Sequence, residues 1–118
     1  MVTIDDVRAV AGPLPRSYEV LVRDRVKFRV GQIVYVAFSA DETLMGFGYP
    51  KEERVALVSS SPGKFVMPRQ SDLRFNWVVA TLSELDYAEM RELVLDAWRM
   101  VVPKFVAAAH DASTGSAS

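Results

Sequence analysis

Basic side chains recur at every second position in one otherwise apolar segment, as Arg25, Lys27 and Arg29. In an extended strand this period of two puts the three cations on one face. The surrounding residues 16–29 hold five basic and two acidic side chains, whereas residues 75–118 hold three basic and six acidic ones. The formal net charge of −1 therefore conceals a local positive surface, of the kind that binds phosphates, acidic proteins or anionic metabolites.

Residues for nucleophilic or acid-base catalysis are scarce. Nucleophilic catalysis needs a Ser, Thr, Cys or Lys side chain beside a base, but the chain has no cysteine and one histidine, His110, in the last segment. The acid-base candidates that remain are carboxylates in expected turns, helix starts or loops, where such groups are ordinarily solvated: Asp41, Glu42, Glu52, Glu53 and Asp72. We therefore expect no catalytic residues and no enzymatic activity.

Metal and cofactor sites are not expected either. Zinc and iron–sulfur sites are built from cysteine and histidine ligands, which this composition does not supply. Gly46, Gly48 and Lys51 superficially resemble a phosphate-binding glycine-rich loop before a helix, but they lack the spacing of either nucleotide-binding fingerprint. A strand end followed by a helix start explains this segment, so we predict no metal and no cofactor.

Signals for a membrane or secreted protein are also missing. No apolar run in the sequence approaches the roughly 18 residues of a transmembrane helix. Asp5 and Asp6 stand where a signal peptide carries positive charge, and no apolar stretch follows them. The sequence therefore predicts a cytoplasmic location without membrane association.

A β-hairpin is expected to hold the basic row. Residues 26–30 alternate in polarity and are followed by Gly31-Gln32, a candidate for a two-residue hairpin turn. Closing that turn brings three apolar pairs together on one face, which we assign to the core. The pairs are Val30 with Ile33, Phe28 with Tyr35 and Val26 with Ala37.

The opposite face of this hairpin then carries the basic row beside an apolar row, Val34, Val36 and Phe38. Long Lys and Arg side chains often cover an open sheet face, so a solvated surface is one interpretation. Contacts to DNA phosphates are a second. A third is a protein partner, including a second copy of the chain docked on the apolar row.

Further extended segments surround the hairpin. Residues 18–22 are compatible with extended backbone, and strands are expected at residues 43–48, 64–67 and 76–81, with a polar exposed loop over 68–74. Trp77 opens the last strand directly after this loop. Its indole is expected either in the core or at the mouth of the loop as a contact residue.

Two helices are expected in the first half of the chain. Thr3 is placed to cap a helix over residues 4–11. Pro50 suits the first turn of a second helix, which is short because residues 59–63 interrupt its apolar pattern.

The last expected helix has the clearest signals. Asp86 and Glu89 form an analogue of the capping box at its start. An apolar stripe with helical spacing then runs from Met90, includes Trp98, and ends before Pro103. We therefore place Trp98 in the core.

The order of these elements is α-β(3)-α-β(2)-α, which predicts a two-layer α+β fold with a mainly antiparallel sheet and helices on one face. Residues 1–105 are expected to form a single domain. Residues 106–118 are small and polar, with little to bury, and are expected to be a disordered C-terminal tail.

Several short motifs, spread from about Thr3 to Lys104, resemble the MmcQ/YjbR family. No single motif is diagnostic, but their order and spacing fit that family. They are Leu14-Pro15, Phe28-Arg29-Val30-Gly31, Pro50-Lys51-Glu52-Glu53-Arg54, Asn76-Trp77-Val78, Ala97-Trp98-Arg99 and Val102-Pro103-Lys104.

This resemblance implies a bacterial α+β domain with a fold like that of secretion chaperones, and brings no catalytic residues or cofactor. It also implies DNA binding through a double-wing arrangement of hairpins or loops. One wing is then the hairpin at Gly31-Gln32, and the other is the segment 64–74. The phosphate-contacting residues expected on this basis are Arg25, Lys27, Arg29, Lys64, Arg69 and Arg74.

Overall fold

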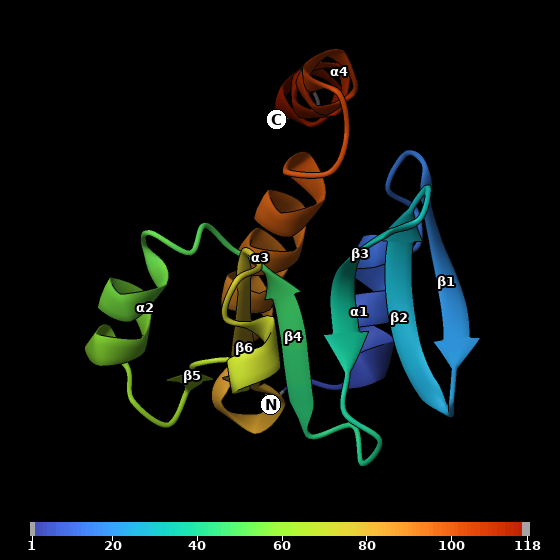
Figure 1. Cartoon of the computed structure of the whole chain (residues 1–118). Helices are drawn as coiled ribbons and strands as arrows, with labels where there is room; N and C mark the ends of the chain where they lie inside the picture. Colours follow the sequence, from blue (N-terminus) through green and yellow to red (C-terminus); the bar gives the residue numbers. More distant parts are fainter. Residues whose placement is uncertain (1, 117–118) are drawn as a thin grey trace.

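The fold is seen in a computed structural model that describes residues 2–116. One six-stranded antiparallel sheet has the order β1-β2-β3-β4-β6-β5 (Figure 1). Its strands are β1 (Ser17–Val22), β2 (Arg25–Val30), β3 (Ile33–Phe38), β4 (Leu44–Gly48), β5 (Phe65–Val66) and β6 (Trp77–Thr81).

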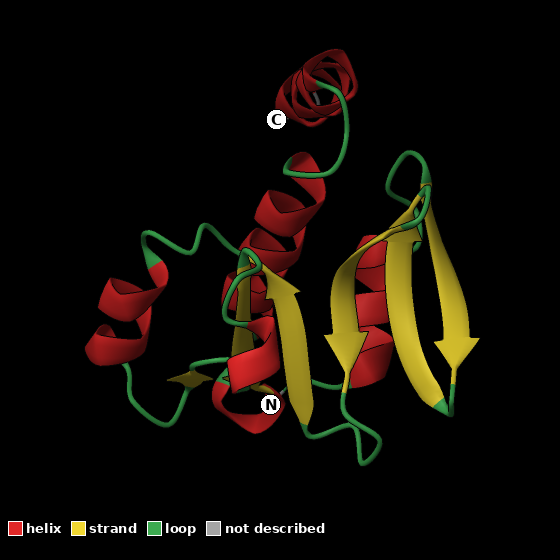
Figure 2. Cartoon of the chain, viewed as in Figure 1, coloured by secondary structure: helices red, strands yellow, loops and turns green. Residues whose placement is uncertain are grey.

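The α-helices of the described chain are α1 (Ile4–Ala11), α2 (Arg54–Ser60), α3 (Tyr87–Arg99) and α4 (Lys104–Ser116). Helices α1 and α3 pack together and cover one face of the sheet, while α2 lies beside β5 (Figure 2). This two-layer α+β architecture confirms the predicted fold class. The structure adds one strand and one helix to the predicted order, because residues 17–22 form β1 at the edge of the sheet and α4 follows α3.

The core lies between the sheet and the α1–α3 layer. Trp98 is fully buried there, as predicted, and its indole nitrogen donates a hydrogen bond of 2.9 Å to the carbonyl oxygen of Pro15. The expected helix caps are present: the hydroxyl of Thr3 accepts from the amide of Asp6, and the carboxylate of Asp86 accepts from the amide of Glu89 at 2.8 Å.

The predicted pairing of β2 with β3 is correct only next to the turn. Val30 lies opposite Ile33 as expected, but a bulge then shifts the register, so that Phe28 lies opposite Val36 and not Tyr35. A one-residue shift moves every following side chain to the other face. Val36 and Phe38, expected on the open face, are therefore 0% and 2% exposed in the core.

The C-terminal segment was expected to be a disordered tail over residues 106–118. The structure differs from that prediction, because residues 106–116 continue α4, whereas residues 117 and 118 lie outside the described part of the chain. Three observations show how this helix is held against the rest of the chain. Val106 is buried, the ring of His110 meets the ring of Trp98 edge-on at 5.0 Å, and Asp111 accepts a hydrogen bond of 2.8 Å from Arg99.

Candidate functional site

The predicted basic row lies on the open face of the sheet. Val26, Phe28 and Val30 of β2 are buried, so the alternating Arg25, Lys27 and Arg29 face away from the α1–α3 layer. Arg25 is exposed, while Lys27 and Arg29 are half-buried. The sequence therefore predicted this feature correctly from its period of two.

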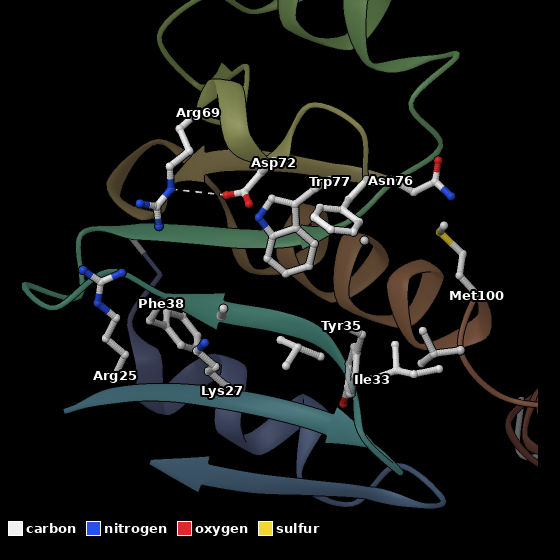
Figure 3. A pocket seen from close by; sticks show the side chains of 15 residues that line it. Arg25, Lys27, Ile33, Tyr35, Phe38, Arg69, Asp72, Asn76, Trp77 and Met100 are labelled. Atoms are coloured by element: carbon white, nitrogen blue, oxygen red, sulfur yellow. Dashed lines mark hydrogen bonds and ion pairs between the residues drawn. The ribbon is translucent and has the colours of Figure 1, made fainter. Parts of the chain in front are cut away.

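A groove of about 570 Å³ runs across this open face (Figure 3). Strands β2, β3 and β4 provide its floor, residues 69–77 provide one wall, and Met100 and Val101, which follow α3, contribute beside Asn76. Its volume falls within the roughly 300–1,000 Å³ of typical ligand sites. The lining residues are Arg25, Lys27, Ile33, Val34, Tyr35, Ala37, Phe38, Gly48, Arg69, Asp72, Phe75, Asn76, Trp77, Met100 and Val101.

The two ends of the groove differ in chemistry. Arg25, Lys27 and Arg69 gather toward one end, although they come from strands and loops far apart in the chain (Figure 3). Ile33 and Met100 lie at the other end and are exposed apolar side chains. The groove is therefore cationic at one end and apolar at the other.

Trp77 stands between these ends, on the open face of β6. Its strand neighbours Val78 and Ala80 point into the core, so the indole points out over the groove (Figure 3). The sequence left two positions open for the indole, the core and the mouth of the loop, and the structure places it at the mouth of the loop. The side chain lies against Gly46 of β4, where a β carbon would come within 2.7 Å of the ring.

Arg54 holds the wall that carries Trp77. This first residue of α2 is 7% exposed, and its guanidinium donates hydrogen bonds to the carbonyl oxygens of Phe75 at 2.9 Å, Trp77 at 3.3 Å, and Leu73. A buried arginine is costly unless its donors are satisfied. Sequence reasoning missed this role, since Arg54 appeared only as part of a helix-opening motif.

Asp72 brings a negative charge into the groove. Its carboxylate accepts a hydrogen bond of 3.3 Å from Nε of Arg69, whose side chain is 73% exposed. Asp72 ends a short 3-10 segment, Gln70–Asp72, and Arg69 directly precedes that segment, so both residues line the same wall. The carboxylate therefore orients Arg69 and partly offsets its charge at the cationic end.

The other predicted phosphate contacts lie outside the groove lining. The ammonium of Lys64 is held at 3.1 Å from the carboxylate of Glu89 on α3. Arg74 is exposed and its guanidinium lies 4.8 Å above the ring of Phe75. The half-buried Arg29 has an Nε atom with no hydrogen-bond partner among the described residues. The structure thus brings together three of the six predicted cations: Arg25, Lys27 and Arg69.

The candidate carboxylates do not assemble a metal centre. Within residues 2–116, no group of three or more His, Cys, Asp or Glu side chains is arranged to hold a metal ion. Asp41 instead organises the turn before β4, where it accepts hydrogen bonds from Ser39 and Thr43, and these hold the pKa of its carboxyl at about 2. Among the helices of the same residues, none is both long enough and apolar enough to cross a membrane.

Among solved structures, the chain is similar to the crystal structure of Deinococcus radiodurans protein DR2400, which has a DUF419 domain. DUF419 is the MmcQ/YjbR family. The match has a TM-score of 0.74 and 24% sequence identity, and covers 86% of this chain and 79% of that chain. It confirms the resemblance at the level of the fold. No protein-family model matches the sequence, and no curated protein matches it.

Proposed function

We propose that this chain is a bacterial, cytoplasmic member of the MmcQ/YjbR family, and that it is a non-enzymatic domain which binds DNA through phosphate contacts. The observation that supports the proposal is the convergence of Arg25, Lys27 and Arg69 at one end of the groove. They come from the hairpin and from the segment after β5, which are the two wings that the family resemblance implies. Cations on two separate segments can contact successive phosphates of one strand.

The proposal narrows the set of expected contacts. Lys64 is left out, because its ammonium already pairs with Glu89 on the helix side of the sheet. Arg29 and Arg74 lie outside the groove lining and are assigned to longer-range attraction of the phosphate backbone. Arg25, Lys27 and Arg69 are the direct contacts.

Fluorescence anisotropy of a labelled DNA duplex, titrated at several salt concentrations, tests this function. Binding through three phosphates predicts that log K falls with log salt with a slope of about −2.7, which is about −0.9 for each phosphate. Arg25→Glu and Arg69→Glu should each weaken binding and flatten the slope. Arg91→Glu is the matched control, since it makes the same charge change at an exposed position on α3.

Two results would refute DNA binding at this site. One is no binding at low salt by the folded wild-type chain. The other is an equal loss of affinity in Arg25→Glu and Arg91→Glu, which would show that only net charge matters. Circular dichroism of each variant checks that the fold is intact.

The competing hypothesis is a module for protein interaction or homodimerisation on the open sheet face. It relied on Val34, Val36 and Phe38. Val36 is fully buried, and Phe38 is only 2% exposed, although it borders the groove. Val34 lines the groove and stays available. Sedimentation of Val34→Asp beside the wild type tests self-association without damaging the core.

A further inference from the structure

The groove is both cationic and aromatic. Arg25, Lys27 and Arg69 stand toward one end, the indole of Trp77 lies in the middle, and Ile33 lies toward the other (Figure 3). A nucleotide has the same polarity, with an anionic phosphate and a flat apolar base face. We infer that the groove binds one nucleotide of single-stranded DNA, with the phosphate at the cations and the base against Trp77.

This inference rests on the proposed function and makes it more specific. Proteins that bind single strands combine a positive groove for the backbone with aromatic side chains on which bases stack. Trp77 is half-buried and faces the groove, and Phe75, two residues earlier in the same wall, is 50% exposed. Contacts to phosphates alone would not require either ring.

Two observations indicate that Trp77 is kept in place for contact. Gly46 leaves room for the ring on the sheet, because a β carbon there would come within 2.7 Å of the indole. The buried Arg54 holds the backbone on both sides of Asn76 through the carbonyl oxygens of Phe75 and Trp77. The indole is thus fixed by the surface of the sheet at Gly46 and by the hydrogen bonds of Arg54 to the adjoining backbone. This lowers the conformational entropy that is lost when a base stacks on the ring.

The size of the groove favours a single strand over a duplex. A volume of about 570 Å³ suits a small ligand, whereas the bases of a duplex are paired and stacked inside the helix. A duplex base would reach Trp77 only after breaking its base pair and rotating out of the stack, which weakens binding. A single strand presents its base faces without that cost.

Intrinsic fluorescence and anisotropy of the chain of 118 residues provide the test. Trp98 is fully buried, so a change on DNA addition reports Trp77. An oligothymidylate of about 12 nucleotides, within the usual site sizes of roughly 4–16, should quench the emission and bind at least tenfold more tightly than a duplex of equal length. An abasic deoxyribose phosphate oligomer should bind more weakly without quenching, and thymidine monophosphate should bind more weakly still.

Variants locate the effect on Trp77. Trp77→Leu should weaken oligothymidylate binding by about 5- to 150-fold, the range expected for loss of one stacked base, and leave binding of the abasic oligomer unchanged. Tyr87→Leu is the matched control, since Tyr87 is an exposed aromatic residue on α3 that does not line the groove. If Trp77→Leu does not fold, Trp77→Phe should retain binding and lose the quenching.

The outcomes separate this inference from the proposed function. Equal affinity for single strand and duplex, absence of quenching, or full binding by Trp77→Leu would overturn the inference while salt-dependent binding of the duplex survived. Thymidine monophosphate that binds as tightly as the oligomer would also overturn it, in favour of a free nucleotide as the ligand. No binding of any DNA at low salt would overturn both.

Discussion

The indole of Trp77 on β6 lies against the backbone of Gly46 on the neighbouring strand β4. A β carbon at Gly46 would stand 2.7 Å from Cζ2 and Nε1 of that ring, a separation that real side chains do not show. Gly48, two residues further along β4, has no such crowding, since a β carbon there would stand 3.6 Å from Cβ of Ala97. Only the first glycine is therefore required by the position of the indole.

Gly46→Ala is expected to displace Trp77 and cost about 1–3 kcal/mol of stability, the usual range for overpacking. Gly48→Ala should cost clearly less, because its β carbon makes an ordinary van der Waals contact. Urea unfolding measures the cost, and a change in tryptophan emission reports the displacement, since Trp98 is buried in the core and the indole of Trp77 lies on the open face of the sheet. Equal costs for the two variants would contradict the proposed packing of the ring.

Arg54→Met should destabilise the protein by about 2–4 kcal/mol, because it removes hydrogen bonds from a charged donor and leaves carbonyl groups unpaired. The carbonyls of Leu73, Phe75 and Trp77 lose their donor, so amide exchange should accelerate in this wall before it does in β2. Arg54→Lys should recover only part of the loss, since one ammonium does not reproduce a planar fork of donors. Full stability of Arg54→Met would refute the anchoring role.

Much of the fold was predictable because local signals and burial agreed. Thr3 and Asp86 cap the helices at the predicted places, and alternating polarity identified β2. Strand β1 was left uncertain because its turn, Arg23-Asp24, contains neither Gly nor Asn. Both residues nevertheless adopt positive φ, at 52° and 65°, as a type I′ turn requires.

The bulge in β3 could not be predicted because the residues on both faces of that strand are apolar. Either register between Phe28 and β3 gives a hydrophobic pair, so the pattern does not decide between Tyr35 and Val36. Tyr35 is accommodated by a hydrogen bond of 2.5 Å between its hydroxyl and that of Ser17 on β1. That long-range contact has no signature in the sequence.

The candidate site was predictable only within one element. The period of two identified Arg25 and Lys27, but whether a cation from a distant loop joins them depends on tertiary structure. Arg69 lies in the groove lining, whereas Lys64, five residues earlier, pairs with Glu89. Both residues carry one positive charge and lie in the same predicted wing, so nothing in the sequence indicated which of them reaches the groove.

Asp72→Asn is expected to strengthen DNA binding by about two- to fivefold. It removes the carboxylate that faces Arg69, and exposed ion pairs of this kind are worth about 0.2–1 kcal/mol. Anisotropy at fixed low salt measures the change. Asp24→Asn makes the same charge change in an exposed turn outside the groove lining, so an equal gain in that control would show a net-charge effect alone.

The carboxyl of Asp41 is expected to titrate near pH 2. Its pKa lies at about 2, below the ordinary 3.8, chiefly because the Ser39 hydroxyl donates to it at 2.7 Å, with further donors from Thr43. Since the folded state lowers this pKa, the stabilisation of the turn is fully present above pH 3.8 and is lost as pH falls toward 2. Side-chain carboxyl NMR should show a higher pKa in Ser39→Ala, and no change in Ser60→Ala.

His110 and Trp98 should reveal whether α4 belongs to the folded domain. Trp98→Ala is expected to cost about 3–5 kcal/mol, as for other large buried aromatic residues. A disordered tail would make His110→Ala neutral, but the edge-on contact of the two rings at 5.0 Å predicts a cost of about 0.5–1.5 kcal/mol. Thermal unfolding measures both costs, with Lys104→Ala at an exposed position of α4 as the control. If His110→Ala lowers stability no more than the control does, and the amides of residues 106–112 are unprotected from hydrogen exchange, the segment is a disordered tail and not a helix of the domain.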